Sequence, residues 1–480
     1  MTTSPIKFGT SGWRGLIADD FTFGTVRLAL HAIAGHLKNK TANPTVLVAY
    51  DTRFYSEEFS ALAVSVLKEH GIKTLLCETF TATPAVAYEI QRRKLDGAIN
   101  FTASHNPAQY HGLKFSGADA GPALPEVTKD IEARAAKMLG KDGSNPFAFA
   151  GHEAHGVKDG HQEKVNLRGD YLKRVNELVR FDVMKKANLK LVADALHGCG
   201  AGYLDKALAD HGIDVKAIRI ERDCLFEGSG PDVSEQNLGK LANAVKEHRA
   251  MAGLATDGDA DRFGIVDGDG TWIQPNLILA LVYDYLVETR GWKMPAARSV
   301  ASTQMVDAIA KFHGQSTYQT PVGFKYVGQL IREDKIALGG EESAGLTIRG
   351  HVPEKDGILA CLLVAEMTAA RRASISEQIR AMFKRLGREF HPVRENLHLS
   401  DEQKANTVRK VAVDASTLLG RKVVSVDRTD GAKFVFDDGS WILVRLSGTE
   451  PIVRLYVEAE SAAATAKLKR QASEWILKNG

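Results

Sequence analysis

Short apolar runs alternate with amphipathic stretches along most of this chain, a pattern typical of helices layered on a largely parallel sheet. The run Thr45–Tyr50 is rich in β-branched residues and has the length of a buried strand. The stretch 56–70 then repeats apolar residues at the period of a helix, with Ser56 placed to cap it and Gly71 to end it. The pattern therefore predicts βα units.

Three rounds of such units can be followed. The first round predicts strands at 45–50, 74–77 and 97–101 and helices at 56–70 and 83–93; the second, strands at 189–193, 214–220 and 252–255 and a helix at 202–211; the third, strands at 299–301 and 335–338 and helices at 306–313 and 325–333. Each round ends in a loop rich in polar side chains. Ligands of α/β sheets bind beyond the carboxyl ends of the strands, so we expect these three loops to converge on one cleft.

The last part of the chain has a different pattern. Strands are predicted at 421–425, 434–436 and 441–445, with a hairpin turn at 437–440 and a closing helix at 464–477. This combination indicates an α+β module. The segment 140–161, rich in Gly, His, Asp and Asn, is predicted to be an exposed connection.

Composition narrows the class of protein. The 480 residues are 44% hydrophobic and 25% charged, which is ordinary globular usage. The 62 basic and 59 acidic side chains nearly cancel, which gives no reason to expect nucleic acid as a partner. We expect no signal peptide and no membrane span, because no apolar run approaches the ~18 residues that a bilayer requires. The four scattered cysteines predict reduced thiols in a cytoplasmic protein. They are Cys77, Cys199, Cys224 and Cys361.

The strongest chemical signal is the stretch Asp257-Gly-Asp-Ala-Asp-Arg262. Side chains two residues apart can point the same way, so three carboxylates can converge on one hard cation. Magnesium fits better than calcium, because the site is small and no bidentate Glu follows at EF-hand spacing. The alternative is a polar turn without a metal, but three carboxylates packed together repel each other unless a cation neutralises them.

The other three loops are less decisive by themselves. Ser104, facing a divalent metal, can accept and return a phosphoryl group, or it can simply stabilise a turn. The stretch Arg445-Leu-Ser-Gly-Thr can surround an anion with backbone N–H groups, hydroxyls and a guanidinium, or it can be a β-turn with an exposed arginine. Glu341-Glu-Ser343 can bind sugar hydroxyls, although Glu and Ser are common in loops.

Together the four loops resemble the signature loops of the α-D-phosphohexomutase family, the phosphoglucomutases and phosphomannomutases. The matching stretches occur in the family's order. They are Thr102-Ala-Ser-His-Asn-Pro107, Asp257-Gly-Asp-Ala-Asp-Arg262, Gly340-Glu-Glu-Ser343 and Arg445-Leu-Ser-Gly-Thr-Glu-Pro451. Three further stretches are similar to family elements, namely Phe8-Gly-Thr-Ser-Gly-Trp-Arg14, Gly323-Phe-Lys325 and Glu354-Lys-Asp-Gly357. Two positions depart from the family's usual residues: Ala260 replaces a frequent glycine, and His111 a frequent asparagine.

The resemblance implies four domains around a central cleft, of which the first three share an α/β topology and the last is α+β. We place their boundaries at 1–161, 162–270, 271–389 and 390–480. It further implies a cytoplasmic enzyme, monomeric or homodimeric, whose partners are hexose phosphates.

The resemblance also assigns roles to residues. Ser104 would be carried as phosphoserine and, with Asp257, Asp259 and Asp261, would bind Mg²⁺. The residues around the reacting phosphate would be Arg14, His105, Lys114 and Arg262. Those that bind the sugar or the non-reacting phosphate would be Gly323, Lys325, Glu341, Ser343, Lys355, Arg445, Ser447, Gly448, Thr449 and Arg454.

The implied reaction is phosphoryl transfer from Ser104 to a hexose monophosphate, with glucose 1,6-bisphosphate as intermediate and activator. The Gly-Glu-Glu-Ser loop is more similar to the phosphoglucomutase version than to the bifunctional one, so we expect glucose to be preferred. The alternatives are a phosphomannomutase, a dual-specificity enzyme or a phosphoglucosamine mutase. A phosphosugar phosphatase and a non-catalytic phosphosugar sensor are the alternatives from other classes.

Overall fold

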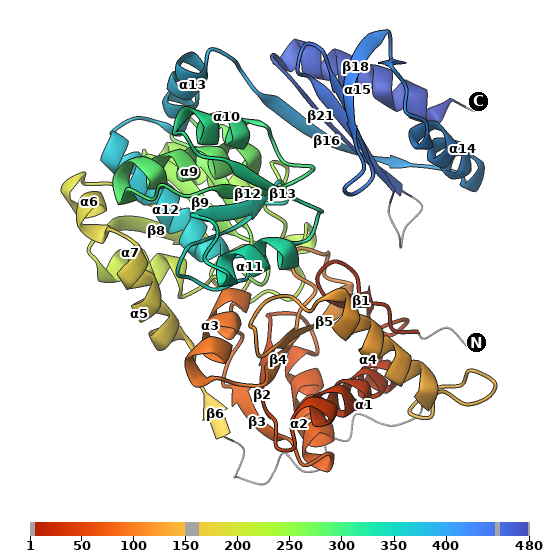
Figure 1. The fold of residues 1–480 in the computed structure, drawn as a ribbon. Coiled ribbons are helices and arrows are strands. Elements are labelled where there is room, and N and C mark those ends of the chain that lie inside the picture. Colours follow the sequence, from red (N-terminus) through yellow and green to blue (C-terminus); the bar gives the residue numbers. More distant parts are fainter. Residues whose placement is uncertain (1–4, 149–162, 447–451, 479–480) are drawn as a thin grey trace.

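A computed structural model describes residues 5–148, 163–446 and 452–478 (Figure 1). The described residues form four sheets, each built from one segment of the chain. No helix among them is long and apolar enough to cross a membrane. Cys77, Cys199 and Cys361 are buried and Cys224 is partly buried, and all four are free thiols.

The first three sheets repeat one topology. In each, three parallel strands joined by helices are followed by an antiparallel fourth strand, in the spatial orders β5-β4-β2-β3, β10-β9-β7-β8 and β15-β14-β12-β13. The first unit comprises β2 (Thr45–Tyr50), α2 (Ser56–Glu69), β3 (Lys73–Cys77), α3 (Thr83–Arg93), β4 (Gly97–Phe101) and β5 (Tyr110–Gly117). The second comprises β7 (Lys190–Asp194), α7 (Leu204–Asp210), β8 (Asp214–Ile218), α8 (Gly239–His248), β9 (Ala252–Thr256) and β10 (Phe263–Asp267). The third comprises β12 (Ala296–Ser299), α10 (Met305–Phe312), β13 (Thr317–Thr320), α11 (Phe324–Arg332), β14 (Leu338–Glu341) and β15 (Gly345–Ile348).

Further elements extend or cover these sheets. Three short strands add to sheet edges: β1 (Trp13–Leu16) beside β5, β6 (Glu163–Val165) beside β3, and β11 (Trp272–Ile273) beside β10. The additional helices are α1 (Phe23–Lys40), α4 (Pro125–Met138), α5 (Arg168–Leu178), α6 (Phe181–Lys186), the 3₁₀ turn η1 (Phe226–Gly228), α9 (Pro275–Arg290), α12 (Gly357–Arg371) and α13 (Ile375–Leu386). One continuous apolar core joins all three α/β units, from Leu47 to Phe390.

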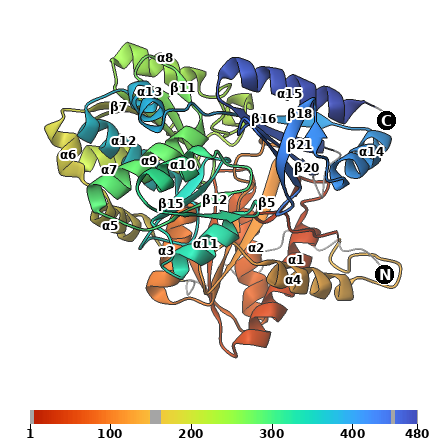
Figure 2. The same cartoon turned by 45° about the horizontal axis from the view of Figure 1, so that its top comes forward.

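The C-terminal module is an antiparallel sheet with two helices, and it lies beside the third unit in both ribbon views (Figures 1 and 2). Its elements are β16 (His391–His398), α14 (Asp401–Ala412), β17 (Thr417–Leu418), β18 (Arg421–Asp427), β19 (Ala432–Phe436), β20 (Trp441–Leu446), β21 (Ile452–Ala459) and α15 (Ala462–Leu477). It has a core of its own. A small apolar cluster, in which Trp441 packs with Val300 and Ala301, joins it to the third unit.

The fold class predicted from the sequence is confirmed, namely three similar α/β units and an α+β module. The boundaries near 161, 270 and 389 stay predictions. Most predicted elements of the first round match to within a residue.

Two strands of the third unit were placed wrongly. The first ends at Ser299 instead of beginning there, because its Ala-Ala-Arg run lacks the β-branched residues on which the prediction relied. The second begins at Leu338, since the predicted stretch 335–338 is mostly the connection after α11. Gly340, which the sequence placed in a loop, is a strand residue, as is Gly339. A Cβ on Gly340 would lie 2.4 Å from Leu279 Cδ1, so this strand needs glycine in order to pack closely.

The predicted capping role of Ser56 was also wrong. The N-cap of α2 is Tyr55, which has φ 65° and makes no side-chain capping bond. The Ser56 hydroxyl instead donates to Asp51 Oδ1 at 3.0 Å. Gly71, with φ 65°, follows the end of the helix as predicted.

Candidate active site

Three polar loops occupy equivalent places in the three α/β units. Each connects the last parallel strand to the antiparallel strand that follows: β4 to β5, β9 to β10, and β14 to β15. Backbone bonds tie the second of these loops to its neighbours, since Thr83 N, at the start of α3, donates to Asp259 O at 2.9 Å, and Phe263 N, at the start of β10, donates to Ala344 O of the third loop at 3.0 Å. The repeated topology is therefore the reason that residues far apart in sequence meet.

The loop after β9 brings three carboxylates together. Asp257, Asp259 and Asp261 are completely buried, and each offers an oxygen within 4.8 Å of the others. The backbone bends tightly here: a Cβ on Gly258 would lie 2.5 Å from the Ser104 carbonyl oxygen, and Ala260 has φ 59°. This left-handed conformation explains why glycine suits position 260.

The donor set fits a magnesium ion. Within the described residues, Asp259 Oδ1 and Asp261 Oδ1 are buried without a hydrogen-bond partner. Buried carboxylate oxygens need a compensating charge or donor. Carboxylate oxygens are also the ligands that Mg²⁺ prefers. The three carboxylates therefore lie close enough together to bind the predicted cation, and two of their oxygens lack the partner that a cation would supply.

Two lysines partly neutralise the cluster. Lys114 Nζ donates to Asp259 Oδ2 at 2.5 Å and to Asp261 Oδ2 at 2.8 Å, and Lys355 Nζ donates to Asp261 Oδ2 at 2.7 Å. Burial raises the pKa of Asp261, but the charges of Lys114, Lys355 and Arg262 outweigh it and hold this pKa below the usual range. Lys355 was predicted to bind substrate, whereas its contact in this structure is with a carboxylate of the candidate metal site.

Ser104 lies directly against this cluster. Its side chain is completely buried, its backbone has φ 53°, and its Oγ donates to Asp257 Oδ2 at 2.8 Å. Burial and the neighbouring charges of Asp259 and Asp261 raise the pKa of Asp257 well above its ordinary value. A hydroxyl held against a carboxylate cluster is well placed to carry a phosphoryl group beside a cation.

Basic side chains surround the serine loop. His105 Nδ1 is 3.3 Å from Ser104 Oγ, and burial together with the charges of Arg262 and Arg14 lowers the pKa of this histidine well below 6.5. Arg14 Nη1 donates to Asn106 Oδ1 at 2.6 Å. Arg262 anchors its own loop, because its backbone N donates to Asp257 Oδ1 at 3.0 Å. All four predicted basic residues of this region, Arg14, His105, Lys114 and Arg262, thus border the cluster.

The last residue of β14, directly before the third loop, is Glu341. Its Oε1 accepts from Gly323 N at 2.6 Å, and burial together with the charge of Glu342 raises its pKa to about 7. Gly323 has φ 134°, a conformation essentially reserved for glycine. The structure thus places Gly323-Phe-Lys325 in contact with Gly340-Glu-Glu-Ser343, two stretches that the sequence identified separately. Ser343 follows in the same loop and is partly buried, and burial lowers the pKa of Lys325 on α11.

The C-terminal module presents two arginines. Arg445 on β20 and Arg454 on β21 are directly opposite each other in an antiparallel pair. Like charges in that position repel each other and favour an anion between or beside them. Arg445 Nε donates to Asp430 Oδ2 at 2.9 Å, and the same oxygen accepts from Val322 N, next to Gly323, at 3.1 Å. The predicted residues Ser447, Gly448 and Thr449 lie outside the described residues.

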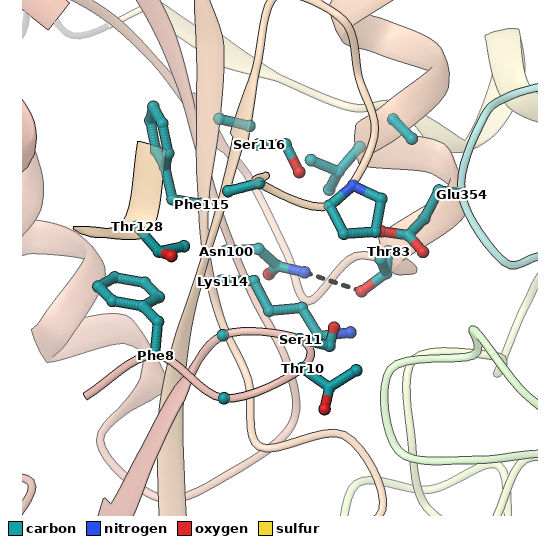
Figure 3. Close-up of a pocket in the computed structure, with 17 residues that line it drawn as sticks. Phe8, Thr10, Ser11, Thr83, Asn100, Lys114, Phe115, Ser116, Thr128 and Glu354 are labelled. Carbon is teal, nitrogen blue, oxygen red and sulfur yellow. Dashed lines mark hydrogen bonds between the residues drawn. The ribbon is translucent and has the colours of Figure 1, made fainter. Parts of the chain in front are cut away.

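Figure 3 shows a pocket behind Lys114, between the Phe8–Gly12 backbone and Glu354. Its volume of about 20 Å³ is enough to hold one water molecule. Asn100 Nδ2 donates to Thr83 Oγ1 at 3.0 Å, which in turn donates to Asp259 Oδ2 at 2.6 Å. Asn100 and Thr83 therefore orient the carboxylate of Asp259, a predicted metal ligand.

Sequence reasoning missed Thr83 and Asn100, because neither stands in a polar loop. It also gave no role to Glu354, although it quoted the stretch that contains this residue. Burial raises the pKa of Glu354 to about 7. The only hint of a role for Glu354 in the sequence was its position directly before Lys355, a predicted site residue.

Comparison with known families agrees with this architecture. Four models match the chain, described as phosphoglucomutase/phosphomannomutase alpha/beta/alpha domain I at residues 5–140, domain II at 169–270, domain III at 274–386 and the C-terminal domain at 395–474. The fold is that of the phosphohexomutases, a class of mutase enzymes, which are isomerases. The chain belongs to the phosphoglucomutase/phosphomannomutase family.

Individual relatives span several sugars. A phosphoglucomutase/phosphomannomutase of Thermococcus kodakarensis is 30% identical, with 95% of this chain and 94% of that protein covered. A phosphoglucosamine mutase of Thermobifida fusca is 31% identical, with 95% and 94% covered. The crystal structure of a candidate phosphomannomutase from Thermus thermophilus is 30% identical and covers 99% of both chains, with a TM-score of 0.84. Other relatives are named phosphoglucomutase. The names therefore define the enzyme class and leave the sugar open.

Proposed function

We propose that this enzyme interconverts α-D-glucose 1-phosphate and glucose 6-phosphate through a phosphoserine at Ser104. The observation that carries the proposal is the buried Ser104 hydroxyl, 2.8 Å from Asp257 Oδ2 and beside two more buried carboxylates. A nucleophile shielded from water next to a cation site is suited to pass a phosphoryl group between alcohols without losing it to hydrolysis.

The reaction balances in two transfers. In the first, the bond between phosphorus and Ser104 Oγ breaks while a bond from phosphorus to a sugar hydroxyl oxygen forms. A neighbouring base takes the proton of that hydroxyl, and Ser104 Oγ, the leaving group, takes up a proton and becomes a hydroxyl. The product is glucose 1,6-bisphosphate. This intermediate turns end for end, and its other phosphoryl group returns to Ser104 by the reverse step. Phosphoryl transfer of this kind depends on positioning and charge neutralisation.

Asp257, Asp259 and Asp261, with the phosphate on Ser104, would hold Mg²⁺, which supplies charge neutralisation to the transferring group. The protein's own cations, Arg14 and Arg262, would orient the phosphate oxygens. The two candidates for the proton-accepting group are His105 and Lys114. His105 Nδ1 lies 3.3 Å from Ser104 Oγ, whereas Lys114 Nζ donates to two carboxylates.

At the other end of the substrate, Arg445, Arg454 and the stretch Ser447–Thr449 would bind the phosphate that is not reacting. Because the sugar phosphate must bind in both orientations, this site must accept a phosphate attached to either C1 or C6. A pair of arginines held by strand pairing meets that need, since guanidinium groups bind phosphate through several alternative donor pairs.

Glucose is the sugar that we favour. Glucose and mannose differ at the C2 hydroxyl, and the support is the Glu341-Glu-Ser343 loop, of which Glu341 is held by Gly323 N. One well-placed hydrogen bond to an epimer is worth roughly 1–3 kcal/mol, so we expect a preference of about tenfold to a hundredfold. The phosphoglucosamine mutases among the relatives make glucosamine 1-phosphate the second sugar to test.

One set of assays tests the whole proposal. Purified enzyme with Mg²⁺ and glucose 1,6-bisphosphate is given glucose 1-phosphate, mannose 1-phosphate or glucosamine 1-phosphate, while 6-phosphate product and free phosphate are both followed. We expect the highest kcat/KM for glucose 1-phosphate and little free phosphate. Equal or reversed values would reject the glucose assignment alone. Stoichiometric phosphate release would instead identify a phosphatase, and binding without turnover a sensor.

A further inference from the structure

Arg53 is a buried arginine that the proposed reaction does not use, and every N–H of its guanidinium group has a partner. The side chain is fully buried, and Nε donates to Asp51 Oδ2 at 3.1 Å. The four remaining N–H groups donate to backbone carbonyls within one short stretch, those of Ser104, Asn106, Pro107 and Tyr110. A guanidinium offers five donors in a fixed plane, so this pattern dictates where four carbonyls of the serine loop must lie.

The consequence is visible in the conformation of the loop. With its carbonyl drawn to Arg53 at 2.8 Å, Ser104 adopts φ 53° and points its hydroxyl the other way, toward Asp257. A left-handed conformation is unfavourable for a serine and persists only where neighbouring contacts impose it. The bond that Ser104 N donates to Thr102 Oγ1, at 2.8 Å, fixes the other end of the residue.

Arg53 is also fixed from the second unit. The ring of Phe226 lies under its guanidinium, with 5.0 Å between the guanidinium carbon and the ring centroid. Arg222 donates to the carbonyls of Arg53 and Thr52, both at 3.0 Å. The serine loop and the unit that carries Asp257 are therefore linked by a second route, besides the contact between Ser104 and Asp257 themselves.

A buried arginine can serve stability alone, but the distribution of its bonds points to more. Burial lowers the pKa of Arg53 although Asp51 raises it, so keeping this charge inside the protein is costly. Four of its five donors serve the loop that carries Ser104, and only one serves Asp51, which follows its own strand.

We propose that Arg53 is a positioning residue for phosphoryl transfer, which acts through the serine loop and not on the substrate. It holds Ser104 Oγ in line with the site of the acceptor hydroxyl, and so decides whether the phosphoryl group passes to sugar or to water. Transfer to a bound sugar depends steeply on alignment, whereas water can approach from several directions. This inference rests on the proposed phosphoserine mechanism.

The test compares Arg53→Lys with wild-type enzyme. Lysine keeps the positive charge but has three donors on one atom, so it cannot hold all four carbonyls. With glucose 1-phosphate, we expect kcat to fall about tenfold to a hundredfold, KM to change less than about threefold, and phosphate released per turnover to rise several-fold. Arg290→Lys is the control, because Arg290 is a partly buried arginine that bonds to the Glu366 carboxylate and the Leu178 carbonyl and makes none of these bonds to the serine loop. It should lower the midpoint of thermal unfolding without changing kcat or phosphate release.

The outcomes distinguish a failure of the positioning role of Arg53 from a failure of the phosphoserine mechanism. If Arg53→Lys lowers only the unfolding midpoint, as the control does, Arg53 is a stabilising residue and the proposal is overturned. If wild-type enzyme never carries phosphate on Ser104, the proposed mechanism itself fails. Should Arg53→Lys not fold, Phe226→Leu serves in its place, because it loosens the guanidinium without removing a donor. We then expect a kcat loss of about threefold with extra phosphate release, and unchanged values in that folded variant would equally reject the proposal.

Discussion

Around Ser104, loops from three units are joined by buried contacts, whereas the candidate phosphate-binding arginines lie on paired strands of the separate C-terminal sheet. Lys114, Lys355 and Ser104 each reach the aspartate loop from a different segment of the chain. Arg445 is fixed in the described residues by one carboxylate, that of Asp430. The hydrophobic cores divide the molecule at the same place: the first three units share one core, and the C-terminal module has its own.

The difference matches the demands of the two ends of a mutase substrate. At the reacting end, a phosphoryl group must meet an acceptor in line, and displacement of about 1 Å can cost a hundredfold in rate. At the other end, the anion must be accepted whether it is attached to C1 or C6. The C-terminal module packs around a core of its own and meets the third unit through a small apolar cluster, whereas the three units at the reacting end share one core. The four predictions that follow test this division.

The largest effect is expected for Ser104→Ala. Alanine cannot carry the phosphoryl group, so turnover should fall by about 10³-fold or more, the scale of losing a nucleophile. Intact mass of the purified wild type should show a partly phosphorylated protein, and the variant should lack that species. The unfolding midpoint should fall only modestly, because the variant loses one buried hydrogen bond to Asp257 while the bonds from Arg53 to backbone carbonyls remain. Full activity in the variant would falsify the phosphoserine mechanism.

Asp259→Asn tests the cation site at the same end. Removing one ligand charge should weaken Mg²⁺ binding by at least about tenfold, since even the loss of an outer partner costs that much. Metal binding is measured directly with Mn²⁺, whose electron paramagnetic resonance signal weakens as the ion binds to the protein. Turnover is measured as a function of Mg²⁺ concentration. Asp267→Asn is the control, because Asp267 is a buried carboxylate of the same unit that accepts from Ile375 N and Ser376 N. Its variant should keep wild-type Mn²⁺ affinity. If both variants bind Mn²⁺ like wild type, the three aspartates form only a turn.

Arg445→Ala probes the opposite end. A charge-assisted hydrogen bond to phosphate is worth roughly 1.5–3 kcal/mol, so KM for glucose 1-phosphate should rise about tenfold to a hundredfold. Phosphoserine content and Mn²⁺ affinity should stay unchanged, since the reacting end is assembled independently. Arg421→Ala, an arginine of the same module that pairs with Asp438, provides the control and should leave KM alone. A loss confined to kcat would contradict the division into two ends.

The contrast between the two ends also separates what the sequence could and could not predict. The three aspartates and Ser104 stand in loops after apolar runs. The local pattern was enough to propose a metal site at the aspartates, whereas for Ser104 it left two interpretations open and the resemblance to the family decided between them. Arg53, Thr83 and Asn100 act through contacts with residues distant in sequence, which no local pattern reports. The shifted strands of the third unit failed for a related reason: their glycines and alanines serve tight packing against α9 and α11, which only the tertiary structure shows.

The smallest expected effect concerns Glu341, which lies between the two ends. Burial and the charge of Glu342 raise its pKa from 4.5 in the unfolded chain to about 7, so the folded protein binds more protons than the unfolded chain between those values. Stability should therefore fall as pH rises from 4.5 to about 7 and level off above, by at most about 1.4 kcal/mol per pH unit for each such group.

Glu354 has a pKa raised to about 7 as well and should contribute a slope of the same sign. Glu341→Gln cannot titrate, so its unfolding midpoint should fall less steeply than that of wild type between pH 5 and 7, with the contribution of Glu354 still present. Thermal unfolding in matched-ionic-strength buffers measures the two slopes. The same variant should lower kcat/KM for glucose 1-phosphate and mannose 1-phosphate alike at pH 7.5, because a glutamine accepts a sugar hydroxyl less strongly than a carboxylate does. Parallel midpoint curves for wild type and variant would mean that Glu341 is already ionised at pH 5, and that Gly323 N–H and nearby cations stabilise its charge more than burial opposes it.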